Sequence, residues 1–231
     1  MSGKEITIKA ADGGQFMGYL SMPASGKGPG VVVIQEIFGV NKVMRDLTDW
    51  LAGEGFVALC PDLFWRQEPG VQLTDKSQEE WGKAFKLMQG FDLGQGVADV
   101  QSTIQALRAV PGCSGKIGAI GYCLGGRLAL LAATRTDADA AVSYYGIYLH
   151  EHLGETIKAP LMLHIAGEDE FFPKEGRDAV RNALKGNPKA VIHDYPGRNH
   201  AFARVGGQNY HKGDADLANS RTISFLNTKL G

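Results

Sequence analysis

The sequence predicts an α/β protein with a mostly parallel central sheet, an N-terminal antiparallel hairpin and helices on both faces of the sheet. Three observations lead to this prediction. Short apolar runs typical of strands alternate with helical patterns along most of the chain. Residues 31–34 are continuously apolar, as expected of a parallel strand buried on both faces. The length of 231 residues, with no long linker, fits a single domain over residues 1–231.

The first half of the chain supplies the hairpin and the first parallel strands. Residues 6–10 and 15–20 alternate polar and apolar side chains around a turn-forming Asp-Gly-Gly at 12–14, which predicts the antiparallel hairpin. After the strand at 31–34, Asn41 is well placed to cap a helix. The apolar face expected for this helix carries Val43, Leu47, Trp50 and Leu51. The next strand is expected at 56–60.

The second half repeats the alternation of strands and helices. Helical patterns cover 78–89 and 94–109 before a strand at 116–122 and a helix at 125–134. Further strands are expected at 140–145, 161–166 and 190–195, with helices at 174–185 and 214–229. This order places the carboxyl ends of the parallel strands at one edge of the sheet, where ligands bind in open α/β sheets.

Composition and charge narrow the classes of function. A net charge of -1 gives no broad attraction to nucleic acid or to anionic membranes. The sequence contains no run of about 18 apolar residues, so we expect no membrane span. The first residues lack the apolar core of a signal peptide. The three cysteines have no ligand spacing. We therefore expect a cytoplasmic monomer with no disulfide, metal or other cofactor.

The stretch around Cys123 carries the strongest functional signal. Gly121-Tyr-Cys-Leu-Gly125 follows an apolar strand and opens a helix, which matches the G-x-nucleophile-x-G elbow of the α/β-hydrolase fold with cysteine in place of serine. The residues two before and two after the nucleophile must be small, so that strand and helix can pass close together. The partial positive charge of the helix N-terminus favours a thiolate at this position.

Two later loops supply partners for such a nucleophile. Gly167-Glu-Asp-Glu170 follows the strand at 161–166, and His200 follows the strand at 190–195. Nucleophile, acid and histidine then occur in the chain order of α/β-hydrolases. Cys123, Asp169 and His200 are therefore the predicted triad, with Glu168 and Glu170 as alternative acids.

Three other kinds of protein fit parts of the sequence less well. A dinucleotide site would use Gly118, Gly121, Gly125 and Gly126, but their spacing is not G-x-G-x-x-G. A metal hydrolase would use His150, His152 and His164, which lack the spacing of paired ligands on a helix. A catalytically inactive binding module would not need the complete triad. The hydrolase remains the favoured interpretation.

Several strings resemble the dienelactone hydrolases (carboxymethylenebutenolidases), a family of the α/β-hydrolase superfamily. They are Q-E-I-F-G-V at 35–40, C-P-D-L at 60–63, G-Y-C-L-G-G at 121–126, Y-Y-G at 144–146 and H-A-F-A-R at 200–204. The resemblance runs nearly from end to end. It implies a cysteine-dependent hydrolase that cleaves small carboxylic esters or enol lactones through a thioester acyl-enzyme.

The resemblance also implies roles for individual residues. The backbone N–H groups of Ile37 and Leu124 would form the oxyanion hole. Glu36 would hydrogen-bond the resting thiol of Cys123 and help to activate it when substrate arrives. Arg204 would bind the carboxylate of the substrate, and Phe38 and Tyr145, which stand in the matching strings, would line the substrate site.

One position departs from the family pattern. Family members that act on the acidic dienelactone have a second arginine where this chain has Trp81, and Phe85 stands where a tyrosine is frequent. A tryptophan enlarges the apolar wall of the site, and a lone arginine binds a carboxylate less securely than a pair. Arg66 could supply the second cation. The alternative function is thus a broad-specificity aryl esterase with little dienelactone activity and with side activity on phosphotriesters.

Overall fold

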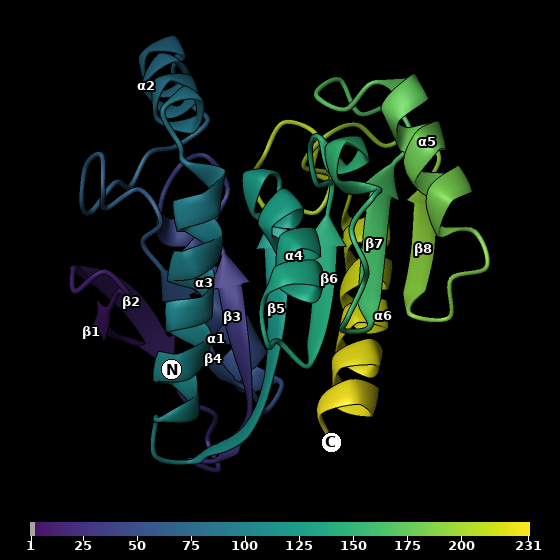
Figure 1. Cartoon of the computed structure of the whole chain (residues 1–231). Coiled ribbons are helices and arrows are strands. Elements are labelled where there is room, and N and C mark those ends of the chain that lie inside the picture. Colours follow the sequence, from purple (N-terminus) through teal and green to yellow (C-terminus); the bar gives the residue numbers. More distant parts are fainter. Residues whose placement is uncertain (1–2) are drawn as a thin grey trace.

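The computed structural model describes residues 3–231, which form an eight-stranded sheet in the order β1-β2-β4-β3-β5-β6-β7-β8 (Figure 1). The strands are β1 (Lys4–Lys9), β2 (Gln15–Ser21), β3 (Gly28–Ile34), β4 (Val57–Pro61), β5 (Cys113–Tyr122), β6 (Ala140–Tyr144), β7 (Leu161–Ala166) and β8 (Ala190–Tyr195). β1 pairs antiparallel with β2, and β2 pairs antiparallel with β4. The other neighbours are parallel. The predicted fold class is confirmed.

Helices cover both faces of this sheet. They are α1 (Lys42–Gly53), α2 (Gln78–Gln89), α3 (Leu93–Arg108), α4 (Leu124–Arg135), α5 (Lys174–Leu184) and α6 (Lys212–Leu230), with a short 3₁₀ turn, η1 (Leu149–His152). α1 and α6 pack into one apolar core and α3, α4 and α5 into the other, so the two groups lie on opposite faces (Figure 1). α2 stands above the carboxyl ends of the strands. No helix within residues 3–231 is long and apolar enough to cross a membrane.

Helix α1 begins where the sequence predicts, and its buried face agrees with the predicted one only in part. Asn41 Oδ1 accepts a hydrogen bond from the Met44 N–H at 3.1 Å and caps the helix. The buried positions are Met44, Thr48, Leu51 and Ala52, whereas the predicted Val43, Leu47 and Trp50 are only half-buried. Thr48 donates its hydroxyl to the Met44 carbonyl at 2.7 Å, which satisfies the one polar group on the buried face. An apolar pattern alone does not detect such a threonine.

The turn between β5 and α4 requires glycine on both sides. A Cβ atom on Gly121 would lie 1.8 Å from the Gly125 carbonyl oxygen. A Cβ atom on Gly125 would lie 2.3 Å from the Ile34 carbonyl oxygen and 2.6 Å from that of Gln35. These neighbours are backbone atoms, which cannot rotate away as a side chain can. The predicted need for small residues around Cys123 is confirmed.

We expect Gly125→Ala to lower the free energy of unfolding by about 1–3 kcal/mol or more, because the new methyl group overlaps backbone oxygens of β3 and its loop. Gly82→Ala is the matched control. Gly82 lies inside α2 with nothing within 4 Å of the added Cβ atom, so alanine should raise stability by up to about 1 kcal/mol. Urea unfolding followed by circular dichroism measures both. Equal effects in the two variants would refute the close contact at the elbow.

Candidate active site

Cys123 occupies the tip of the turn that joins β5 to α4. Its backbone angles, φ 57° and ψ -115°, lie outside the regions that non-glycine residues normally adopt. The Cys123 N–H donates to the Tyr144 carbonyl at 3.1 Å, and the Cys123 carbonyl accepts from the Gly126 N–H at 2.9 Å. The residue is 8% exposed and lies at the N-terminus of α4. The strained turn therefore fixes one thiol at the edge of the sheet.

Asp169 and His200 meet beside this thiol, although they come from different loops. Asp169 follows β7, and His200 follows β8. His200 Nδ1 lies 2.9 and 3.0 Å from the two carboxylate oxygens of Asp169, and both side chains are buried. Of the alternative acids, Glu170 accepts a hydrogen bond from Asn199 at the surface and Glu168 is exposed. Of the three candidate acids, Asp169 is the one that contacts His200.

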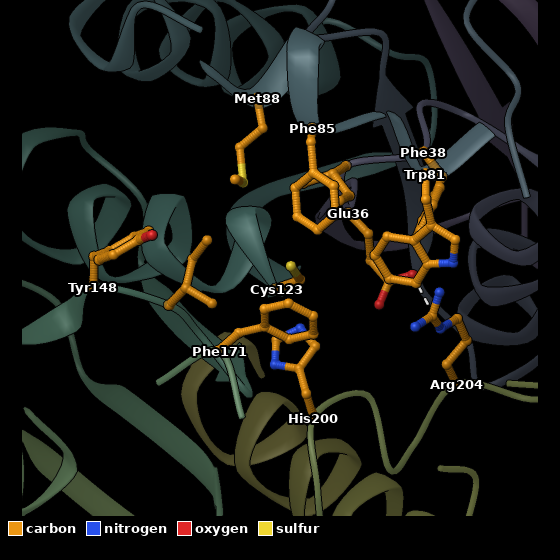
Figure 2. A pocket seen from close by; sticks show the side chains of 12 residues that line it. Glu36, Phe38, Trp81, Phe85, Met88, Cys123, Tyr148, Phe171, His200 and Arg204 are labelled. Carbon is orange, nitrogen blue, oxygen red and sulfur yellow. Dashed lines mark ion pairs between the residues drawn. The ribbon is translucent and has the colours of Figure 1, made fainter. Parts of the chain in front are cut away.

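The surroundings of His200 favour its charged form once Cys123 has lost its proton. Burial disfavours an imidazolium, but a negative charge on the Cys123 sulfur and the carboxylate of Asp169 outweigh this effect and raise the pKa of His200. Its Nε2 atom is buried, and a hydrogen bond with the Cys123 side chain is among the causes that raise this pKa. Figure 2 shows the imidazole next to Cys123, and both residues line one cavity. The arrangement can move a proton between sulfur and imidazole.

Glu36 and Arg204 form a second buried pair in the same cavity. Glu36 Oε2 lies 3.6 Å from Arg204 Nε (Figure 2). Arg204 Nη1 lies 3.5 Å from Asp75 Oδ2, a partner that the sequence analysis missed. Burial opposes the charge of Arg204, but Glu36 and Asp75 outweigh it and raise the pKa of the guanidinium. Neither carboxylate oxygen of Glu36 has a hydrogen-bond partner among the described residues, so the expected bond to the Cys123 thiol is not formed here.

The two predicted oxyanion donors belong to segments that pack closely. Leu124 is the first residue of α4, where N–H groups have no acceptor within the helix. Ile37 follows β3, and the contact of Gly125 with the backbone of residues 34 and 35 draws these two segments together. Ile37 and Cys123 line the same cavity. Ile37 and Leu124 therefore both lie at the carboxyl ends of the strands, as Cys123 does.

The cavity that contains Cys123 has a volume of about 80 Å³ and mainly apolar walls. Phe38, Trp81 and Phe85 line it, as predicted for substrate-contacting residues. Trp81 packs edge-on against Phe38 and stacks on Phe85, with ring centroids 4.9 and 5.4 Å apart. Tyr145 is placed differently: its ring packs against His200 at 5.1 Å and does not line this cavity. Tyr145 therefore supports the histidine.

Comparisons with known proteins identify the family of this chain. The model of the dienelactone hydrolase family matches residues 16–230. A carboxymethylenebutenolidase of Pseudomonas putida is 40% identical, covering 96% of this chain and 94% of its own. An Azospirillum brasilense protein assigned as a carboxymethylenebutenolidase is 49% identical, covering 98% and 99%. A Klebsiella pneumoniae structure assigned as a dienelactone hydrolase superposes with a TM-score of 0.85 at 28% identity, covering 96% of both chains.

The chain belongs to the dienelactone hydrolase family. Membership of this family identifies it as a hydrolase within the α/β-hydrolase fold. The names of these relatives do not favour the alternative of a broad aryl esterase with phosphotriester side activity.

In this dienelactone hydrolase family member, four further residues that were not predicted from the sequence line the cavity. They are Met88 on α2, Ile147 and Tyr148 after β6, and Phe171 after β7. Phe171 donates its N–H to Asp169 Oδ1 at 2.9 Å, and its ring packs edge-on against His200 at 4.9 Å. In the sequence, only the position of Phe171, two residues after the predicted acid Asp169, indicates that it lies near the site.

The other candidate residues lie elsewhere in this family member. Arg66 pairs with Asp99 at 2.9 Å and Asp12 at 2.5 Å, so it does not replace the second arginine. His164 lies inside β7 and bonds the hydroxyls of Tyr195 and Thr222. Residues 3–231 contain no group of three or more metal-ligating side chains placed to hold a metal ion.

Proposed function

We propose that this dienelactone hydrolase family member hydrolyses carboxylic esters and enol lactones through a Cys123–His200–Asp169 triad. The observation that carries the proposal is the buried Asp169–His200 pair beside a thiol held at a strained elbow. A thiol, an imidazole and a carboxylate from three separate stretches of the chain thus lie side by side, as nucleophilic catalysis requires. The names of the relatives give the substrate class, small esters and lactones.

In the proposed reaction, His200 Nε2 takes the proton of the Cys123 thiol as sulfur attacks the carbonyl carbon. The oxyanion accepts hydrogen bonds from the N–H groups of Ile37 and Leu124, each worth roughly 3–4 kcal/mol in such sites. The carbon–oxygen bond then breaks, and His200 returns the proton to the leaving oxygen. A water molecule deprotonated by His200 attacks the thioester, which releases the acid and restores the thiol.

Glu36 gives the resting site a second buried negative charge near Cys123. A neighbouring carboxylate disfavours a second negative charge on sulfur, while Arg204 holds Glu36 in place. We propose that substrate binding disturbs this pair and that Glu36 then takes part in activating the thiol. We further propose that the enzyme works as a cytoplasmic monomer without a cofactor.

Hydrolysis of a dienelactone and of a neutral aryl ester, each assayed with and without a chelator, tests this proposal. We expect turnover of both, with kcat/KM unchanged by the chelator, because thiol, imidazole and N–H groups supply every step. Turnover that the chelator abolishes would replace the triad with a metal-dependent mechanism. No turnover of either ester would reject the proposed activity.

A further inference from the structure

A second cavity of about 340 Å³ adjoins the one that contains Cys123. Five side chains line both cavities: Trp81, Phe85, Phe171, His200 and Arg204. The second cavity differs in its remaining lining, which is polar and comprises Asp75, Glu170, Gln208 and Asn209. An apolar chamber with the thiol and a polar chamber without it therefore meet at His200.

This division assigns the two parts of an ester to the two cavities. It rests on the proposed function, in which Cys123 binds the acyl carbon and His200 protonates the leaving oxygen. Cys123 and Ile37 line only the first cavity, so the acyl group must lie there. The leaving oxygen must be next to His200, and the second cavity is lined by His200 but not by Cys123.

A buried polar atom at this junction indicates that it can receive a polar ligand. Arg204 Nε lies 3.6 Å from Glu36 Oε2 but makes no hydrogen bond within the described part of the chain. Its side chain lines both cavities. Unsatisfied buried donors and acceptors are costly, so polar groups of a substrate or water are expected to meet them.

The charges around the second cavity do not suit an anion. Arg204 faces two carboxylates, Asp75 at 3.5 Å and Glu36 at 3.6 Å, so its charge is already countered. Glu170 adds a third carboxylate at the rim. Lys76 lies 3.1 Å from Asp75, but its side chain is 65% exposed, and solvent screens it more than the buried groups.

We propose that the second cavity is the leaving-group subsite and that Asp75 makes it select neutral or cationic alcohols over anionic ones. Asp75 acts in two ways in this proposal. It forms an ion pair with the guanidinium of Arg204, which would otherwise attract a carboxylate of the substrate. It also places its own negative charge beside the leaving group. A cationic leaving group therefore gains from Asp75, and an anionic one is repelled.

Three phenyl acetates test the proposal: 3-methoxyphenyl, 3-(trimethylammonio)phenyl and 3-carboxyphenyl acetate. All deliver the same acetyl group to Cys123 and differ in the charge of the alcohol. The quantity compared is the ratio of kcat/KM for the anionic ester to that for the cationic one. Intrinsic reactivity cancels when this ratio is compared between the wild type and a variant.

We expect Asp75→Asn to raise this ratio about tenfold, as loss of one charge contact in a mostly buried site implies. Glu79→Gln is the control, because Glu79 is an exposed acid at the start of α2 and lines neither cavity. A ratio that changes no more in Asp75→Asn than in Glu79→Gln would overturn the subsite while leaving the proposed hydrolase intact. If the wild type cleaves none of the three acetates, both the subsite and the proposed hydrolase activity are overturned.

Discussion

Cys123→Ala should lower kcat/KM for ester hydrolysis by at least about 10⁴, because alanine leaves only the oxyanion hole and substrate binding to assist water. The fold should persist, since the strained turn is held by backbone bonds to Tyr144 and Gly126 that do not involve the thiol. Steady-state assays and circular dichroism measure the two properties separately.

Cys113→Ala provides the matched control for this variant. Cys113 is a half-buried free cysteine at the start of β5, and it does not line either cavity. Its replacement should leave kcat/KM within about twofold of the wild type, as for a surface substitution away from the site. Substantial activity in Cys123→Ala, or an equal loss in both variants, would remove Cys123 from the mechanism.

Asp169→Asn should reduce kcat by about 10³–10⁴, although the shape of the side chain is kept. The carboxylate accepts the hydrogen bond of His200 Nδ1, and an amide that donates from its nitrogen favours the wrong tautomer of the imidazole. The variant should also lower the pKa of His200, because the Asp169 carboxylate is one of the groups that raise it. Steady-state kinetics and an NMR titration of His200 measure the two effects.

Glu168→Gln separates this role from a general effect of losing an acid in the loop after β7. Glu168 is exposed and adjacent to Asp169 in sequence, yet its side chain does not contact His200 through a hydrogen bond in the described residues. Activity should stay within about twofold of the wild type, as expected for an exposed position. Similar losses in the two variants would contradict the assignment of Asp169.

Much of the fold is predictable because alternating strands and helices leave a periodic record in the sequence. The strands at 161–166 and 190–195 and the helix at 78–89 were placed at their observed bounds. β3 begins earlier than predicted, at Gly28, since Gly28 pairs with Cys113 across an irregular register and glycine carries no strand signal. Pairing between distant segments is not encoded in local periodicity.

The contacts of the site residues were only partly predictable. Cys123, Asp169 and His200 each follow a strand, and parallel strand ends converge at one edge, so their meeting could be inferred from order alone. Asp75 lies in an aperiodic connection, and nothing near it in sequence indicates that it contacts Arg204. Tyr145 was assigned to the right region, but the direction of its ring, toward His200, depends on packing.

Acid quenching during turnover, followed by peptide mass spectrometry, tests the thioester intermediate most directly. The wild-type enzyme should be mixed with an excess of phenyl acetate and stopped within a few turnovers. We expect one acetyl group on the peptide that contains Cys123, and none in the Cys123→Ala variant. An acetyl group on another residue, or rapid turnover with Cys123 never acetylated, would contradict the proposed mechanism.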